Sequence, residues 1–217
     1  MKWEYLIFNI LIAGGATMAA RWYPRGKLPK VKMAAVSIFL VGGSYVIWDM
    51  LVAGKWWNFN PLYVWGWKLG GLPVEEMLFF VTVPWACLVI WENIRDKISG
   101  EWELKQWRWV MVVGAAAVAA WAMDGGRWYT AVVAGLAAGI MLATGSRWGK
   151  STAVLAAVVT VLNLMCNGYL TARPVVVYNR VVISGVRVGT VPVEDLVYGW
   201  ILVWGVVKVY EKSDKIK

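Results

Sequence analysis

The chain has 217 residues, of which 60% are hydrophobic and 16% charged, and it contains 17 tryptophans and no histidine. A soluble domain is about half apolar and about a quarter charged, so this composition favours a membrane protein. The lack of histidine excludes a Ser-His-Asp triad and histidine metal ligands, and no G-x-G-x-x-G or C-x-x-C spacing indicates a nucleotide, flavin or zinc site. We therefore expect no metal and no cofactor. The net charge of +9 is assigned to orientation in a bilayer and not to nucleic-acid binding.

Apolar stretches of roughly 17–23 residues recur along the whole chain, about the length that crosses roughly 30 Å of hydrocarbon. Tryptophan and tyrosine gather at the ends of these stretches, as in the aromatic belt of a membrane protein. We predict membrane-spanning helices at Trp3–Trp22, Val31–Ala53, Pro73–Trp91, Trp107–Met123, Trp128–Thr144, Ser151–Leu170 and Pro192–Tyr210.

Basic residues predict how the chain is oriented. Most of the 22 lysines and arginines fall in the connections after the first, third and fifth spans and in the C-terminal tail. Because cytoplasmic loops are rich in Lys and Arg, the N-terminus is expected outside and the C-terminus in the cytoplasm, which requires an odd number of spans. The prediction is an all-α, multi-pass protein of the cell membrane with seven transmembrane helices.

A ten-residue segment occurs twice. Residues Gly70–Phe79 match Gly189–Tyr198, 119 positions later, and Asn60 falls opposite Asn179 at the same offset. Both copies open a span, and these two spans run in the same direction. We predict two parallel three-helix repeats, a first over residues 1–95 and a second over 128–217, joined by a cytoplasmic loop and linker helix over 96–127.

Each copy carries two adjacent acids after a proline, and these are the predicted catalytic residues: Glu75, Glu76, Glu194 and Asp195. Proline suits the first helical turn, and acids there complement the helix dipole, so a single copy has a purely structural explanation. Repetition beside hydrocarbon, where ionisable groups are costly, favours function. A neutral acid beside an ionised one would provide acid/base catalysis, and which acid plays which role stays open.

Further candidates come from spacing and polarity. Residues four apart share a helix face, which places aromatic side chains over the acids: Phe79, Phe80 and Tyr198. Polar candidates within spans are Asp49, Asn163 and Asn167, which either bond helices together or support the acids. Polar candidates in the outer loop before the last span are Arg173, Asn179, Arg180 and Arg187, which either pair with Glu194 or Asp195 or are solvated.

At these motifs the chain resembles carotenoid cyclases of the heterodimer-type lycopene cyclase family, in the fused form found in archaea. The resembling segments are Leu72–Phe80, Gly168–Val176, Tyr178-Asn179 and Val186–Gly199. The resemblance implies a non-redox isomerase (an intramolecular lyase) of carotenoid biosynthesis that cyclises the ends of lycopene to β-ionone rings, giving β-carotene. It also implies a substrate dissolved in membrane lipid and bound near Phe79, Phe80, Tyr198, Asp49, Asn167, Asn179 and Arg187.

Other functions remain open. Within the family, the ring type depends on which proton is lost, so an ε-ring or C50 cyclase is an alternative. A small proton-coupled transporter would also use paired acids at a repeat interface. A retinal protein is disfavoured because Lys208 lies near the end of the last span, and an intramembrane prenyltransferase because aspartate-rich motifs are lacking. A homo-oligomer is compatible with this sequence.

Overall fold

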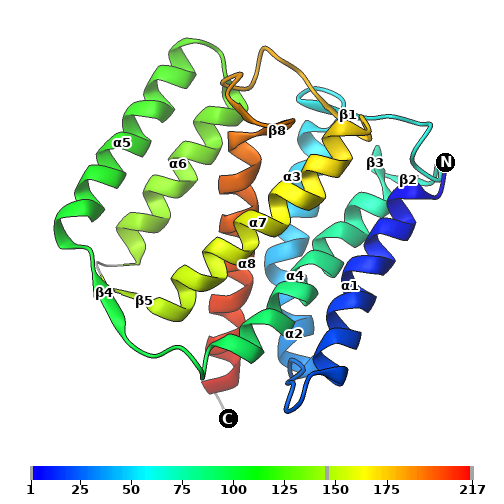
Figure 1. Ribbon diagram of the computed structural model, residues 1–217. Coiled ribbons are helices and arrows are strands. Elements are labelled where there is room, and N and C mark those ends of the chain that lie inside the picture. The colour runs from blue at the N-terminus through cyan, green and yellow to red at the C-terminus, as the bar shows by residue number, and fades with distance from the viewer. Residues whose placement is uncertain (1, 145–146, 216–217) are drawn as a thin grey trace. The chain divides into compact units, whose positions relative to one another are not determined.

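The computed structural model describes residues 2–144 and 147–215, and it is mostly helical (Figure 1). Because α2, η1 and α3 follow one another without a break, the described residues form seven helical segments, one at each predicted span. The ends of the two predicted repeats, Met1 and Lys217, lie outside the described residues. The helices are α1 (Glu4–Trp22), α2 (Val31–Ser37), the π-helix η1 (Ile38–Gly42), α3 (Gly43–Val52), α4 (Val74–Ile94), α5 (Lys105–Asp124), α6 (Trp128–Ala143), α7 (Lys150–Ala172) and α8 (Val193–Lys215).

Short strand pairs lie in the connections, and the all-helical prediction missed them. They pair as β1 (Trp57–Phe59) with β6 (Val176–Tyr178), β2 (Lys68–Leu69) with β3 (Leu72–Pro73), β4 (Glu101–Glu103) with β5 (Arg147–Gly149), and β7 (Arg187–Val188) with β8 (Val191–Pro192). The β2–β3 and β7–β8 hairpins turn at Gly70 and Gly189, whose φ angles of 58° and 63° are left-handed and favour glycine. Strands of two or three residues carry no readable alternation, so the sequence pattern does not predict them.

Within the described residues, three helical segments are long and apolar enough to cross a membrane: Val31–Val52, Val74–Ile94 and Lys150–Ala172. Helix α6 is also apolar but shorter. Large apolar side chains such as Leu11, Phe39 and Met165 are exposed on helices, where lipid would cover them. The chain is therefore membrane-associated, and the seven-span topology remains a prediction.

The chain divides into two compact units. Unit 1 runs from the N-terminus to Lys97 and adds Arg173–Val177 and the part of α8 from Leu202 onward, whereas unit 2 comprises Ile98–Ala172 and Tyr178–Ile201. This grouping by compactness does not follow the predicted repeat boundaries, since it splits α8 between the units. The division into repeats at residues 95 and 127 stays a prediction.

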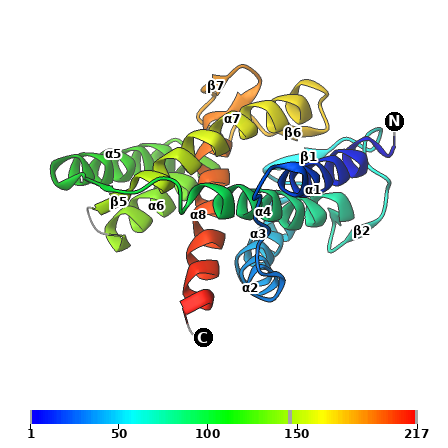
Figure 2. The same ribbon diagram turned by 60° about the horizontal axis from the view of Figure 1, so that its bottom comes forward.

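In unit 1, α4 is the central helix. Helix α1 lies beside it in both ribbon views (Figures 1 and 2), and η1 and α3 also pack against it. The approach of η1 depends on Gly42, because a methyl group there would lie 2.6 Å from the carbonyl oxygen of Phe80. The indole of Trp85 in α4 donates to the hydroxyl of Thr17 in α1 (2.9 Å), which adds a polar link to this packing.

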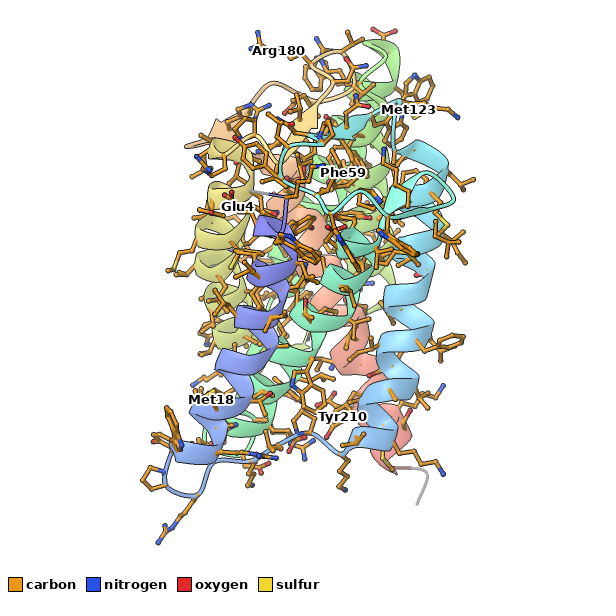
Figure 3. The ribbon with its side chains drawn as sticks, turned by 90° about the vertical axis from the view of Figure 1, so that its right-hand side faces the viewer. Glu4, Met18, Phe59, Met123, Arg180 and Tyr210 are labelled. Carbon is orange, nitrogen blue, oxygen red and sulfur yellow. The ribbon has the colours of Figure 1, made fainter. Side chains whose placement is uncertain are left out.

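A polar cluster joins the helices at one end of unit 1. The hydroxyl of Tyr210 in α8 donates to Glu92 of α4 (2.7 Å) and accepts from the backbone N–H of Lys30 (3.0 Å), while Arg95 pairs with the same Glu92 oxygen (3.2 Å). Figure 3 shows Tyr210 toward the Met18 end of α1, opposite the end marked by Glu4 and Phe59.

Beyond this cluster, an exposed ion pair links the first connection to the end of α4. The Lys27 ammonium lies 2.7 Å from Asp96 and, through this hydrogen bond and its charge, holds the pKa of that carboxyl below its usual range. Because the pair is solvated, its contribution to stability is small.

In unit 2, α5 and α6 form an antiparallel pair, side by side in both ribbon views. The Arg108 guanidinium donates to the carbonyl oxygens of Met141 and Leu142, which would otherwise lack partners at the end of α6 (2.9 and 2.7 Å). At the other end of α6, the backbone N–H of Tyr129 donates to Val182 of the long loop before β7 (3.0 Å). This bond fixes the loop to the start of α6.

Candidate active site

The first pair of acids lies in the opening turn of α4. Pro73 ends the β2–β3 hairpin, helix geometry begins at Val74, and Glu75 and Glu76 follow at once. Both are buried, with Glu75 only 1% exposed and Glu76 8%. Since buried acids are costly unless they are hydrogen-bonded, the contacts of each oxygen are informative.

Glu75 is held at one oxygen only. Its Oε1 accepts a 2.5 Å hydrogen bond from the backbone N–H of Trp65, in the loop before β2. Its Oε2 is buried and has no hydrogen-bond partner among the described residues. The backbone at this position is fixed as well, because the Asn9 amide donates to the Glu75 carbonyl oxygen (3.1 Å) and accepts at its Oδ1 from the Thr82 hydroxyl (2.6 Å).

Glu76 is held by a tyrosine. The hydroxyl of Tyr5, a buried residue of α1, donates to Glu76 Oε2 at 2.5 Å. The ring of Tyr5 is also 6.4 Å from that of Phe79, one turn further along α4. The second acid of this pair therefore lies beside aromatic rings and accepts a phenolic hydrogen bond.

The second pair of acids opens α8 in unit 2 in a similar way. Glu194 and Asp195 are each 3% exposed. Glu194 Oε1 accepts from the backbone N–H of Ser184 (2.7 Å) and from the hydroxyl of Thr130 in α6 (2.5 Å). Its Oε2 is buried and, like that of Glu75, has no hydrogen-bond partner in the part of the chain that the structure describes.

Asp195 is held by two tyrosines. Tyr129 in α6 donates to Oδ1 (2.8 Å) and Tyr178 in β6 donates to Oδ2 (2.6 Å). The two phenol rings are stacked with 6.3 Å between their centroids, and the ring of Tyr198 meets Tyr129 edge-on at 5.9 Å. The amide of Asn163 fixes the backbone by donating to the Asp195 carbonyl oxygen (3.0 Å).

The two sites are built alike although each belongs to its own unit. Trp65 and Ser184, whose backbone N–H groups hold Glu75 and Glu194, are 119 positions apart, as the acids are. Asn60 and Asn179 show the same relation, since each accepts at its Oδ1 from the backbone N–H two residues later (3.1 Å in both). This turn shapes the loop that carries the N–H donor.

The tyrosines of the two first helices also correspond. The Tyr5 backbone N–H donates to Tyr63 and that of Tyr129 to Val182, two acceptors again separated by 119 positions. Both phenols then reach the second acid of their pair. The structural equivalence thus extends beyond the motif that the sequence comparison detected.

The predicted aromatic residues lie near the acids of their own unit. Phe80 is buried and its ring is 5.8 Å from that of Phe79 and 5.7 Å from that of Tyr45. Tyr198 contacts Tyr129, which holds Asp195. These rings bring π-faces to both pairs.

The predicted polar residues lie in different surroundings. Asp49 is buried in α3 of unit 1, and Asn167 donates to Asn163 Oδ1 (3.0 Å), one step from the Asp195 backbone. Asn179 is exposed and shapes its turn, and the exposed Arg187 donates to the carbonyl oxygen of Thr190 (2.5 Å).

Arg173 follows neither of the two alternatives left open for it, which were a pairing with Glu194 or Asp195 and solvation without an acidic partner. Its guanidinium forms an ion pair with Glu4 (2.9 Å) and lies over the ring of Tyr63. The physical reason is that Glu4 is a nearly buried acid in the first turn of α1, and a guanidinium offsets the cost of burying it.

Side chains that hold the acids in the described part of the chain and were missed as site residues include Tyr5, Tyr129, Tyr178 and Thr130. Tyr5 and Tyr129 lie at the ends of predicted spans, where the aromatic belt already explains a tyrosine. They could have been found by comparing the repeats, because each lies in the first turn of the first helix of its predicted repeat. Tyr178 lies in one of the segments that resemble the family, but neither it nor Thr130 has a polar counterpart in the first repeat, so the comparison of the two repeats indicated neither.

The arrangement is that of a helical, membrane-associated protein with two buried acid pairs lined by aromatic rings. In the described residues, no group of three or more His, Cys, Asp and Glu side chains is placed to hold a metal ion.

A family model described as lycopene cyclase matches residues 2–94 and 126–213. These segments make up most of the chain and contain both acid pairs, so the chain belongs to the lycopene cyclase family. Membership implies a cyclase enzyme with a carotenoid substrate. Comparison with curated proteins gives no match, nor does comparison with solved structures.

Proposed function

We propose that the protein is a lycopene β-cyclase of the fused, archaeal type that forms the rings of β-carotene by acid/base catalysis at Glu75, Glu76, Glu194 and Asp195. The observation that carries the proposal is the pair of equivalent glutamates, each buried and each with one oxygen that meets no protein partner among the described residues. Such an oxygen is the expected place for a group that meets a substrate.

Ring closure requires a proton donor, a proton acceptor and a surface that stabilises a cation. A carboxylic acid protonates the terminal double bond of lycopene, the neighbouring double bond attacks the resulting cation to close the ring, and loss of a ring proton forms the ring alkene. The net reaction is an isomerisation, so no oxidant or reductant is consumed. Aromatic faces stabilise a cation without reacting with it, which is the role proposed for Phe79, Phe80 and Tyr198.

The remaining predicted residues have supporting roles in this proposal. Asn167 orients Asn163, which holds the Asp195 backbone, and Asn179 shapes the loop that carries the Ser184 N–H. Asp49 and Arg187 are proposed to contact the bound carotenoid or its surroundings. Membrane lipid is the medium from which the substrate enters.

We also propose that the protein is an integral cell-membrane protein with seven spans, its N-terminus outside and its C-terminus in the cytoplasm. In unit 1 the acids lie at the start of α4 and the basic residues Lys27, Lys30 and Arg95 gather at the opposite end. This distribution supports the orientation, because basic residues remain on the cytoplasmic side.

The test is to express this chain alone in a bacterium that accumulates lycopene and to separate the pigments. New β-carotene, or its one-ringed intermediate, is the expected result. Glu75→Gln or Glu194→Gln should severely impair ring formation while the protein still inserts into the membrane. Lycopene that stays unchanged, with the chain present in the membrane, would contradict the proposal and direct attention to a C50 substrate or to transport. ε-Rings would revise the ring type alone.

A further inference from the structure

We infer that the two acids of each pair have fixed and different roles: the first, Glu75 or Glu194, donates the proton from its Oε2, and the second, Glu76 or Asp195, is the carboxylate that receives one. This division rests on the proposed cyclase function and assigns the acid and the base within it.

The first acids are held as proton donors would be. A neutral carboxylic acid accepts hydrogen bonds at its carbonyl oxygen and carries its proton on the other oxygen. The backbone N–H of Trp65 donates to Glu75 Oε1, and both donors on Glu194 converge on its Oε1. In both residues the proton is therefore assigned to Oε2, the oxygen that is buried and unpartnered among the described residues.

A buried oxygen without a partner is destabilising, and native structures contain few of them. Here the same oxygen, Oε2, lacks a partner among the described residues in both copies of the motif. In both copies the glutamate is held by a backbone N–H from a loop that an asparagine shapes. A repeated cost of this kind is explained if Oε2 faces the alkene during turnover, because an alkene offers a π-bond to protonate and no hydrogen-bond donor.

The second acids are held as carboxylates. Tyr5 donates to Glu76, and Tyr129 and Tyr178 donate to the two oxygens of Asp195. Phenol donors stabilise an ionised carboxylate, whose oxygens offer about four lone-pair sites and thus can still accept a proton. The three tyrosines are positioning residues, since they act through the acid that they hold.

The step balances within one pair. The O–H bond at Glu75 Oε2 breaks and its proton forms a C–H bond at the terminal alkene, whose other carbon becomes a cation. The next double bond supplies the electrons that close the ring. A ring C–H bond then breaks, its electrons form the ring alkene, and its proton passes to Glu76. One proton enters and one leaves, and the pair regains its starting state when a proton returns to Glu75. Glu194 and Asp195 do the same in unit 2.

The experiment compares two double variants in lycopene-accumulating cells. Glu75→Gln/Glu194→Gln removes both donors but keeps the side-chain shape and an oxygen that accepts from Trp65 and Ser184. Glu76→Gln/Asp195→Asn removes both acceptors. Membrane-inserted protein is quantified for each, and all ring-containing and hydroxylated pigments are separated and measured.

The donor variant should form rings of every kind about 10²–10⁴-fold more slowly than wild-type protein. The acceptor variant should still generate the cation. It should therefore form fewer rings, and these should carry a displaced double bond or a hydroxyl group from water that added to the cation. Tyr5→Phe/Tyr129→Phe should shift the product pattern in the same direction, which a merely structural role would not do. The assigned roles are overturned if the donor variant forms rings with displaced double bonds. They are also overturned if the acceptor variant forms no rings while wild-type protein does.

Failure of the proposed function looks different, because wild-type protein would then form no rings at all. If the donor variant does not reach the membrane, Glu75→Asp/Glu194→Asp decides. This double variant retains both carboxyl groups, so it should form β-rings slowly and give the same set of products as wild-type protein. A changed set of products would contradict the assignment.

Discussion

The cluster around Tyr210 provides a stability test that does not depend on the reaction. Its hydroxyl is fully buried, donates to Glu92 (2.7 Å) and accepts from the Lys30 backbone (3.0 Å), so it joins α8, α4 and the start of α2. Tyr210→Phe removes this hydroxyl without changing the ring. The variant should unfold at a lower temperature because Glu92 loses a donor that water does not replace.

The size of the effect follows from the charge on Glu92. A hydrogen bond to a charged group contributes about 1.5–3 kcal/mol. For a chain of this length each kcal/mol corresponds to about 2–4 °C, so the unfolding midpoint should fall by roughly 3–12 °C. Because Arg95 still pairs with Glu92 in the variant, at 3.2 Å, the lower part of this range is expected.

The measurement is thermal unfolding of the purified protein in detergent for Tyr210→Phe, Glu92→Gln and the double variant. The matched control is Tyr23→Phe, at the same end of unit 1, whose exposed side chain should change stability by less than about 0.5 kcal/mol. If the two single effects simply add, within about 0.5 kcal/mol, the residues are not coupled and the reasoning is refuted.

Two further variants test close contacts. Gly42→Ala should cost about 1–3 kcal/mol, because its methyl group would lie 2.6 Å from the backbone of α4, whereas Gly43→Ala next to it enters open space and should be neutral or stabilising. Thermal unfolding of both proteins measures this, and equal effects would contradict the packing. Thr130→Val should slow ring formation by roughly two- to tenfold, since Glu194 loses a hydroxyl worth about 1 kcal/mol. Thr160→Val, whose hydroxyl donates to Ala156 of its own helix, is the control in pigment assays, and equal rates of ring formation in the two variants would refute the role of Thr130.

The sequence predicted the helices well because their signal is local. An apolar run of sufficient length specifies a helical segment, and all seven predicted spans coincide with helical segments within the described residues. The two acid pairs could also be found in the sequence, because the motif occurs twice and the alignment of its two copies singles out the shared acids. Short hairpins were not, because strands of two residues have no period.

Contacts between residues distant in the chain could not be predicted from composition or spacing. Tyr5 and Glu76 are 71 positions apart, and a tyrosine at the start of a span is explained equally well by the membrane interface. The backbone donor at Trp65 is invisible in the sequence because every non-proline residue has an N–H. The partner of Arg173 stayed open because charge alone does not distinguish Glu4 from Glu194, Asp195 or solvent.

The two sites differ at one pair of positions, and this difference makes a last prediction. Tyr178, which holds Asp195, corresponds at the 119-residue offset to Phe59, and Asp195 corresponds to the longer Glu76. At corresponding positions of the sequence, the repeat with the shorter acid has a tyrosine and the repeat with the longer acid has a phenylalanine. We interpret the phenol as filling the space that the missing methylene of Asp195 leaves.

Asp195→Glu alone should then press its carboxyl against Tyr178, a crowding that costs about 1–3 kcal/mol and lowers ring formation. Adding Tyr178→Phe recreates the combination found in unit 1 and should restore part of the activity, although each change is harmful by itself. Pigment analysis of the two single variants and the double variant measures this, with membrane abundance as the control. A double variant less active than either single one would show that the phenol acts on Asp195 independently of its length, and the compensation would be refuted.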